Sequence, residues 1–320
     1  MGARVTTRRT IDPLKIYDTL SRRKKRFTPV KDKKVSIFVC GPTVYDHAHI
    51  GHARCFVFFD VVARYLRMKG YSVFYLQNIT DIAKKINRKA IEQGKKPKEI
   101  IDFYKKSFLK DMNALNVRSV NKYASASDYM KEIISQVSRL VKKGCTYSTN
   151  EGILFNSKCF RGFGKLVNFK KQKIFTDIEK SDTKINKHDF FLWRKNMDSS
   201  MLSWPSPWGR GIPGWHIEDT AITEKYFGSR YDIHGGGMDL IYPHHEAERA
   251  QMESLSEKNP FVNYWMHVNL LNIRGKKMSK SKGNCIYINN ILKNDSPNSV
   301  RLFLLSKNYR GRLNFSEKNL

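Results

Sequence analysis

The stretch that decides the fold runs from Val39 to Phe56 and reads VCGPTVYDHAHIGHARCF. The apolar segment Val35–Val39 leads into it, and a segment with helical periodicity, His52–Lys69, follows it and stops at Gly70. The next apolar segment, Ser72–Gln77, again has strand character. A strand, a helix and a second strand in this order predict a βαβ unit, and hence a parallel sheet with a right-handed crossover.

The remainder of the chain continues this α/β pattern. We expect a stretch without regular structure, rich in basic residues, up to about Lys195, and then a rigid loop at Trp204–Trp208. The other expected elements are the helices Pro97–Leu115, Ser127–Lys143, Tyr242–Glu253 and Pro297–Lys307, the hairpin Thr146–Phe155, and the strands Tyr231–His234 and Tyr264–Ile273.

The charge of the chain points to a polyanionic partner. Its 320 residues include 59 Lys and Arg against 29 Asp and Glu, which gives a formal net charge of +30. The excess is clustered at Arg22–Arg26, Lys84–Lys110 and Lys158–Lys195, and such clusters favour nucleic acid. The alternative is an organism whose proteins are all rich in lysine.

Other bulk properties indicate a cytoplasmic protein without a membrane partner. The sequence contains no run of 18 apolar residues that could span a bilayer. Its five cysteines (Cys40, Cys55, Cys145, Cys159 and Cys285) are odd in number and have no regular spacing. We therefore expect reduced thiols.

The turn His49-Ile50-Gly51-His52 has the features of a phosphate site. It lies where the expected strand passes into the helix, and the first N–H groups of a helix attract anions. Gly51 allows a phosphate or a flat base to approach the backbone, and the two imidazoles can donate hydrogen bonds to a triphosphate. The alternative is a pair of structural histidines.

A second motif, Lys277-Met278-Ser279-Lys280-Ser281, follows the expected turn at Gly275. Two lysines on a loop bounded by glycine can hold the leaving pyrophosphate. A solvated lysine loop is the alternative for this motif taken alone. The two motifs in this order, on a βαβ sheet, look like the two signatures of class I aminoacyl-tRNA synthetases.

More segments extend the resemblance to a single family. The chain resembles cysteinyl-tRNA synthetases from about Lys15 to Leu320. The matching segments are Val39–Asp46, Asn78–Asp81, Trp204–Trp208, Pro213–Glu218, Asp232–Gly237 and Pro243–Glu246. The resemblance implies a Rossmann-like catalytic domain in two halves, 1–120 and 201–290, with a connective α/β insertion at 121–200 and the start of a helical region at 291–320.

The resemblance also implies a zinc ion that binds the thiolate of the substrate. By position its ligands are Cys40, Asp219, His244 and Glu248. Without the resemblance, Cys40 could be an ordinary buried thiol and His244 an ordinary structural histidine. The bacterial pattern has cysteine at position 219, whereas archaeal-type members resemble this chain in having an acid there. Further departures are Ala83-Lys84, where the family has two acids, and Lys282, where it has an apolar residue.

The remaining site residues come from the same comparison of motifs. His49, His52, Lys277 and Lys280 are the expected catalytic residues, and Thr80 and Trp215 match positions that line the amino-acid pocket beside Cys40. The expected ATP contacts, with Mg²⁺ bound to the nucleotide, are Thr43, His49, Gly51, His52, Gly235, Gly236, Asp239, Lys277, Met278 and Lys280.

The expected reaction is ATP-dependent activation of L-cysteine and its transfer to tRNA-Cys by a monomer. Members of the family continue past the segment that ends at Leu320 into helices that read the anticodon, so this chain corresponds to the catalytic region. One alternative is a related ligase that passes cysteine to a small amine, like the mycothiol-pathway enzyme. Another is an inactive RNA-binding paralogue. The net charge favours tRNA over a small amine.

Overall fold

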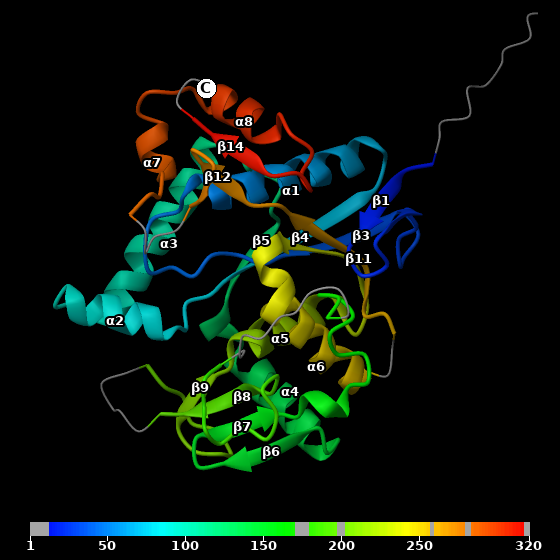
Figure 1. Cartoon of the computed structure of the whole chain (residues 1–320), viewed down its shortest axis with the longest axis vertical. Helices are drawn as coiled ribbons and strands as arrows, with labels where there is room; N and C mark the ends of the chain where they lie inside the picture. The colour runs from blue at the N-terminus through cyan, green and yellow to red at the C-terminus, as the bar shows by residue number, and fades with distance from the viewer. Residues whose placement is uncertain (1–12, 170–178, 197–201, 257–258, 279–282, 317–320) are drawn as a thin grey trace, which may run out of the picture.

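A five-stranded parallel sheet forms the centre of the molecule (Figure 1). The computed structural model describes residues 13–169, 179–196, 202–256, 259–278 and 283–316. All neighbouring strands of this sheet pair in parallel, as the sequence predicts. In spatial order they are β11 (Val262–Val268), β10 (Tyr231–Gly237), β3 (Lys34–Val39), β4 (Ser72–Ile79) and β5 (Lys122–Ser125).

The strand order reverses between β3 and β10. From β3 the chain proceeds through β4 to β5 on one side, and it returns later to add β10 and β11 on the other side. Open α/β sheets bind their ligands beyond the carboxyl ends of the strands at such a reversal. The residues that follow β3 and β10 are therefore the first place to look for a site.

The helix α1 (Ile50–Met68) connects β3 to β4, as predicted. Phe56, Phe59, Ala63 and Leu66 are buried, and their spacing puts one apolar stripe of the helix against the core. Four more helices belong to this part of the molecule: α2 (Lys84–Glu92), α3 (Pro97–Ala114), α7 (Ile288–Ile291) and α8 (Pro297–Leu305). Among the described residues, no helix is both long enough and apolar enough to cross a lipid bilayer.

A second, antiparallel sheet is inserted after β5. The helix α4 (Met130–Lys142) precedes it, and the strands lie in the order β6 (Thr146–Thr149), β7 (Gly152–Phe155), β8 (Phe190–Lys195), β9 (Gly211–Pro213). The hairpin prediction is confirmed by β6 and β7. The prediction of irregular structure up to Lys195 is wrong for β8, because Phe190–Trp193 are fully buried and pair with β7.

The insertion also corrects the expectation that all cysteines are free. Cys145 and Cys159 are joined by a disulfide, with their Cα atoms 5.4 Å apart. The other three cysteines are not disulfide-bonded. The sequence separation of 14 residues gives no sign of this pairing, which depends on the turn after β7.

Two helices lie between the central and the inserted sheet (Figure 1). These are α5 (Trp215–Phe227) and α6 (Glu246–Ser256). On α5, Ile217 and Ala221 pack into the core beneath the inserted sheet, whereas Ile222 packs into the core beside β10 and β11. Both faces of α5 are therefore buried, and the helix is held rigidly between the sheets.

Short strands complete the fold: β1 (Lys15–Asp18), β2 (Arg23–Arg26), β12 (Leu271–Ile273), β13 (Lys276–Lys277) and β14 (Leu313–Phe315). The prediction of one strand over Tyr264–Ile273 is wrong, since β11 ends at Val268 and β12 belongs to another sheet. The extended strand ends there because Nη1 of the buried Arg54 donates to the carbonyl oxygens of Asn269 and Leu270, each at 2.8 Å.

Candidate active site and metal centre

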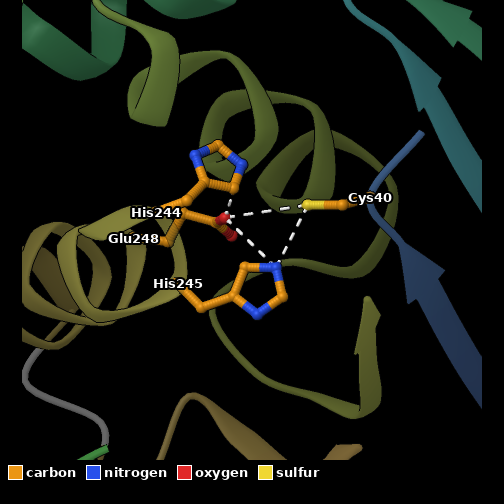
Figure 2. A group of neighbouring side chains, drawn as sticks. All are labelled: Cys40, His244, His245 and Glu248. Atoms are coloured by element: carbon orange, nitrogen blue, oxygen red, sulfur yellow. Dashed lines mark hydrogen bonds and ion pairs between the residues drawn. The ribbon is translucent and has the colours of Figure 1, made fainter. Parts of the chain in front are cut away.

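A buried cluster of thiol, imidazole and carboxylate groups lies beyond the carboxyl end of β3. Cys40 follows β3 directly, and its Sγ lies 2.9 Å from Oδ2 of Asp219 on α5 and 3.2 Å from Nε2 of His245. Nε2 of His244 lies 3.0 Å from the same Asp219 oxygen and 3.1 Å from Oε1 of Glu248. Figure 2 shows the side chains of Cys40, His244, His245 and Glu248 pointing toward one another. The structure thus brings the four expected ligands together.

The start of α6 explains how this cluster forms. His244 and Glu248 are four residues apart and lie on one face. The expected helix Tyr242–Glu253 differs at its beginning, where the extended backbone of Tyr242 (φ −134°, ψ 133°) kinks the chain and α6 starts at Glu246. Two consecutive residues of a regular α-helix point in directions about 100° apart, whereas both His244 and His245 reach the cluster here.

Burial dominates the electrostatics of the cluster. It raises the pKa of the Cys40 thiol, and the neighbouring Asp219 and Glu248 raise it further. Burial and Asp219 likewise raise the pKa of Glu248, and burial lowers the pKa of His245. Three potential anions therefore crowd together, and a bound cation would relieve that cost. Cysteine, histidine and carboxylate donors are a set that fits zinc.

Outer residues hold the donor groups in place. Asn78 donates from Nδ2 to Oδ1 of Asp219 at 2.5 Å, and its Oδ1 accepts from the backbone N–H of Gly41 at 2.6 Å. Nδ1 of His216 lies 2.9 Å from Nδ1 of His244. Fixing the second nitrogen of a ligand histidine is a common feature of metal sites.

The expected pocket residues line the same region. Trp215, the first residue of α5, stacks on His244 with ring centroids 4.2 Å apart, and 40% of its surface is exposed. Thr80 is buried and forms an isolated parallel bridge with Thr43. Trp215 thus contacts the cluster directly, whereas Thr80 is linked to it through Asn78, whose Nδ2 lies 3.4 Å from Oγ1 of Thr80 and also binds Asp219.

The paired histidines form a reciprocal cap at the start of α1. Nδ1 of His49 accepts from the backbone N–H of His52 at 3.3 Å, and Nδ1 of His52 accepts from the backbone N–H of His49 at 3.2 Å. The rings stack with centroids 3.7 Å apart. Because both Nδ1 atoms accept, each ring carries its proton on Nε2. The two imidazoles are therefore fixed as N–H donors at the end of a helix that attracts anions.

The second signature reaches this turn through Met278. A Cβ atom on Gly51 would lie 2.8 Å from Cε of Met278, so glycine leaves room for the methionine. The backbone of Lys277 belongs to β13, whereas Lys280 lies outside the described residues. The structure thus places Met278, at the start of the lysine loop, against the turn His49–His52.

The glycines at the end of β10 allow close packing. A Cβ on Gly235 would lie 2.2 Å from the ring of Phe59, and one on Gly236 would lie 2.8 Å from the ring of His245. Asp239 follows on a short 3₁₀ turn, Met238–Leu240, and is exposed. Larger residues at the two glycines would push β10 away from α1 or from the cluster.

Sequence reasoning missed several buried residues of this region. His234 on β10 lies 3.4 Å from Oε2 of Glu248, and its Nδ1 lies 2.6 Å from the hydroxyl of Tyr231. His245 could have been noticed from its place beside His244, but its inward direction depends on the kink at Tyr242. Glu218 is buried, and neither of its carboxylate oxygens has a hydrogen-bond partner among the described residues.

Comparison with known proteins agrees with this geometry. Residues 26–320 match the family model described as tRNA synthetases class I (C) catalytic domain. The chain is 50% identical over 305 residues to a cysteine–tRNA ligase of Thermoplasma volcanium, covering 95% of this chain and 67% of the relative. It is 43% identical over 309 residues to the enzyme of that name from Thermococcus gammatolerans, covering 96% of this chain and 64% of the relative.

Solved structures show the same fold at low sequence identity. A methionyl-tRNA synthetase of Mycobacterium tuberculosis in complex with methionyl-adenylate is similar with a TM-score of 0.69 and 17% identity. The match covers 89% of this chain and 67% of that structure. The chain therefore spans about two thirds of the length of the relatives that it matches.

Proposed function

Since the chain belongs to the family of class I tRNA synthetase catalytic domains of the cysteine type, we propose that it activates L-cysteine with ATP and transfers it to tRNA-Cys. One observation carries the proposal. The buried cluster of Cys40, Asp219, His244 and Glu248 lies where the strand order reverses, and the phosphate-binding turn at His49–His52 follows the same strand.

We propose that Cys40, Asp219, His244 and Glu248 hold a zinc ion. When bound, the zinc would supply a Lewis-acidic site that prefers a thiolate to a hydroxyl group. Trp215 and Thr80 would position the amino acid beside it. Serine is nearly isosteric with cysteine, and a pocket that selects by shape alone discriminates weakly between such substrates. The donor set therefore supports cysteine as the substrate.

The phosphate end of the site uses helix α1. His49 and His52 donate from Nε2, and the start of the helix adds its N–H groups, so charge that develops on the triphosphate meets oriented donors. We propose that Lys277 and Lys280 bind the leaving pyrophosphate together with Mg²⁺, and that the backbone at Gly235 and Gly236 faces the nucleotide. The cysteine carboxylate then attacks the α-phosphorus, and pyrophosphate leaves.

The test is cysteine-dependent exchange of pyrophosphate into ATP, followed by transfer of labelled cysteine to tRNA-Cys. We expect exchange with cysteine and none with serine. Cys40→Ser should abolish exchange, whereas Cys285→Ser, which replaces a half-buried thiol outside the cluster, should retain it. Exchange by Cys40→Ser at the wild-type rate would contradict the proposal. Transfer to a small amine and none to tRNA would assign the alternative acceptor.

We also propose that the chain works in the cytoplasm as a monomer. The proposed partners, tRNA-Cys and L-cysteine, require no membrane, and both signatures and the cluster lie within one chain. Light scattering on the purified protein tests the monomer.

A further inference from the structure

Three side chains form a line that ends at Cys40. The Oγ1 atom of Thr19 lies 2.8 Å from Nδ1 of His267, and Nε2 of His267 lies 2.8 Å from Nδ1 of His245. Nε2 of His245 then lies 3.2 Å from Sγ of Cys40. Both rings are buried, and Thr19 is half-buried. Each of the three contacts needs one proton donor and one acceptor, so the direction of any one contact fixes the others.

The sulfur sets that direction. Sγ of Cys40 is also 2.9 Å from a carboxylate oxygen of Asp219, and an ionised carboxylate can only accept. If the sulfur is a thiol, its proton points to Asp219 and its lone pairs face His245. If the sulfur is a thiolate, it has no proton to give. In both states the proton between Cys40 and His245 belongs to Nε2 of His245.

From this geometry we infer that Thr19, His267 and His245 are positioning residues, which act in line to present one N–H group to the sulfur of Cys40. Thr19 donates to Nδ1 of His267, and Nε2–H of His267 donates to Nδ1 of His245. Nε2–H of His245 then donates to Cys40. His245 is thereby a hydrogen-bond donor to a ligand and not itself a ligand.

The inference rests on the proposed metal centre and decides between Asp219 and His245 as its fourth ligand. His245 is near enough to the other donor atoms to be a fourth ligand in place of Asp219. A ligand nitrogen must offer a lone pair, however, and the Nε2 lone pair is taken by the proton in this arrangement. A donor to the sulfur also offsets the crowding of Cys40, Asp219 and Glu248, because it stabilises negative charge on the sulfur.

The decisive experiment measures tautomers and ligands in the zinc-loaded protein. Long-range ¹⁵N–¹H spectra of histidine-labelled protein should show His245 and His267 with the proton on Nε2, assigned with His245→Gln and His267→Gln. Zinc-edge X-ray absorption should show one imidazole ligand. Protons on Nδ1 of both rings, or two imidazole ligands, would overturn the inference. Wild-type protein that takes up no zinc would contradict the metal centre, while the tautomers would still decide the line of hydrogen bonds.

Variants of Thr19 separate the effect of its hydroxyl group from the effect of its side-chain size. Thr19→Val keeps the shape and removes the donor, and we expect it to weaken zinc binding about 10-fold in competition with a chelator. Thr19→Ser should restore the affinity. As the matched control, Thr149→Val removes a hydroxyl that bonds the carbonyl of Gly152 in the inserted sheet, and it should leave zinc affinity unchanged. Equal affinities for Thr19→Val and wild type would show that the hydroxyl plays no part.

Discussion

At the scale of single residues, Asp219 connects the metal centre to its support. One of its carboxylate oxygens contacts both Cys40 and His244, and the other accepts from Asn78. Because α5 is buried on both faces, this carboxylate has little freedom to move away. Asp219 is therefore placed to act as a ligand and to hold the end of β4 against α5.

Replacing Asp219 tests its role directly. Asp219→Ala should weaken zinc binding by at least about 10-fold, and Asp219→Cys should preserve or tighten it, because zinc accepts thiolate well. Zinc content and chelator competition on the purified variants measure both effects. An Asp219→Ala variant with wild-type zinc affinity would mean that another group, with His245 the nearest candidate, completes the ligand set.

The sequence predicts only part of this site. The expected ligands were recognisable because each lies within or directly beside a long motif that resembles a known family. His234, His267 and Asn78 were not recognisable as partners, since their contacts depend on which strands become neighbours in the sheet. The disulfide between Cys145 and Cys159 was missed for the same reason.

At the scale of elements, α1 links the two signatures. Its first turn contains the paired histidines, and Gly51 is in contact with Met278. Asp60 in its middle accepts hydrogen bonds from Arg64 of the same helix and from two other segments, at Arg118 and at Arg301. The helix and its strand neighbours could be predicted from periodicity. The break between β11 and β12 could not, because a buried arginine on α1 causes it.

Gly51→Ala should slow adenylate formation by about 10- to 100-fold while leaving cysteine affinity unchanged. The added Cβ would lie 2.8 Å from Cε of Met278 and 3.0 Å from the ring of His49, so the methionine tip and the imidazole must shift, and small misplacements of positioning groups cost rate of this order. Single-turnover kinetics measure the effect.

The double variant Gly51→Ala/Met278→Ala supplies the control, because shortening Met278 removes the closest contact of the added Cβ. We expect it to recover most of the rate that Gly51→Ala loses, relative to Met278→Ala alone. Independent, additive effects of the two substitutions would show that the contact between Gly51 and Met278 is irrelevant.

Asp60→Asn should lower the free energy of unfolding by about 1.5–3 kcal/mol at pH 7. Burial would raise the pKa of Asp60, but bonds from Ser119, Arg64 and Arg301 outweigh it and hold the pKa below its usual value. A carboxyl group whose pKa is lower in the folded than in the unfolded protein stabilises the fold at pH values above its unfolded pKa. This stabilisation is lost as the pH falls through the folded pKa. The difference between wild type and variant should therefore shrink below about pH 4.

Denaturant titrations between pH 3 and pH 7 measure this difference. Asp102→Asn is the matched control, since Asp102 pairs with Lys98 on the exposed face of α3 and should change stability by less than about 0.5 kcal/mol. A difference that does not depend on pH would assign the effect of Asp60→Asn to packing instead of charge.

At the scale of the whole molecule, two sheets share one pair of helices. The inserted sheet packs on α4, α5 and α6, and the same α5 and α6 supply Asp219 and Glu248 of the metal centre. The α/β class and the presence of an insertion could be predicted from the order of the motifs. Of its antiparallel arrangement only the hairpin of β6 and β7 could be predicted. The pairing of β8 and β9 could not, because these strands are short and lie far in sequence from that hairpin.

The net charge of +30 gives a prediction at this scale. Affinity for tRNA-Cys should fall on the order of 10³-fold between 50 mM and 200 mM salt, because phosphate neutralisation releases counterions. Cysteine-dependent pyrophosphate exchange should change far less over the same range. Filter binding and exchange assays measure the two. An affinity that hardly responds to salt would favour the alternative that the positive charge only reflects an organism whose proteins are all rich in lysine.

The buried Arg54 has a consequence for how the chain is made. Its guanidinium binds carbonyl oxygens of Asn269 and Leu270, and also that of Gly311 at 2.7 Å, 257 residues further along the chain. On the ribosome, α1 emerges long before these acceptors are synthesised. The guanidinium of Arg54 therefore cannot make these hydrogen bonds until the segments that contain Asn269, Leu270 and Gly311 have been synthesised. The nucleotide end of the site acquires its final support only after nearly all of these residues have left the exit tunnel.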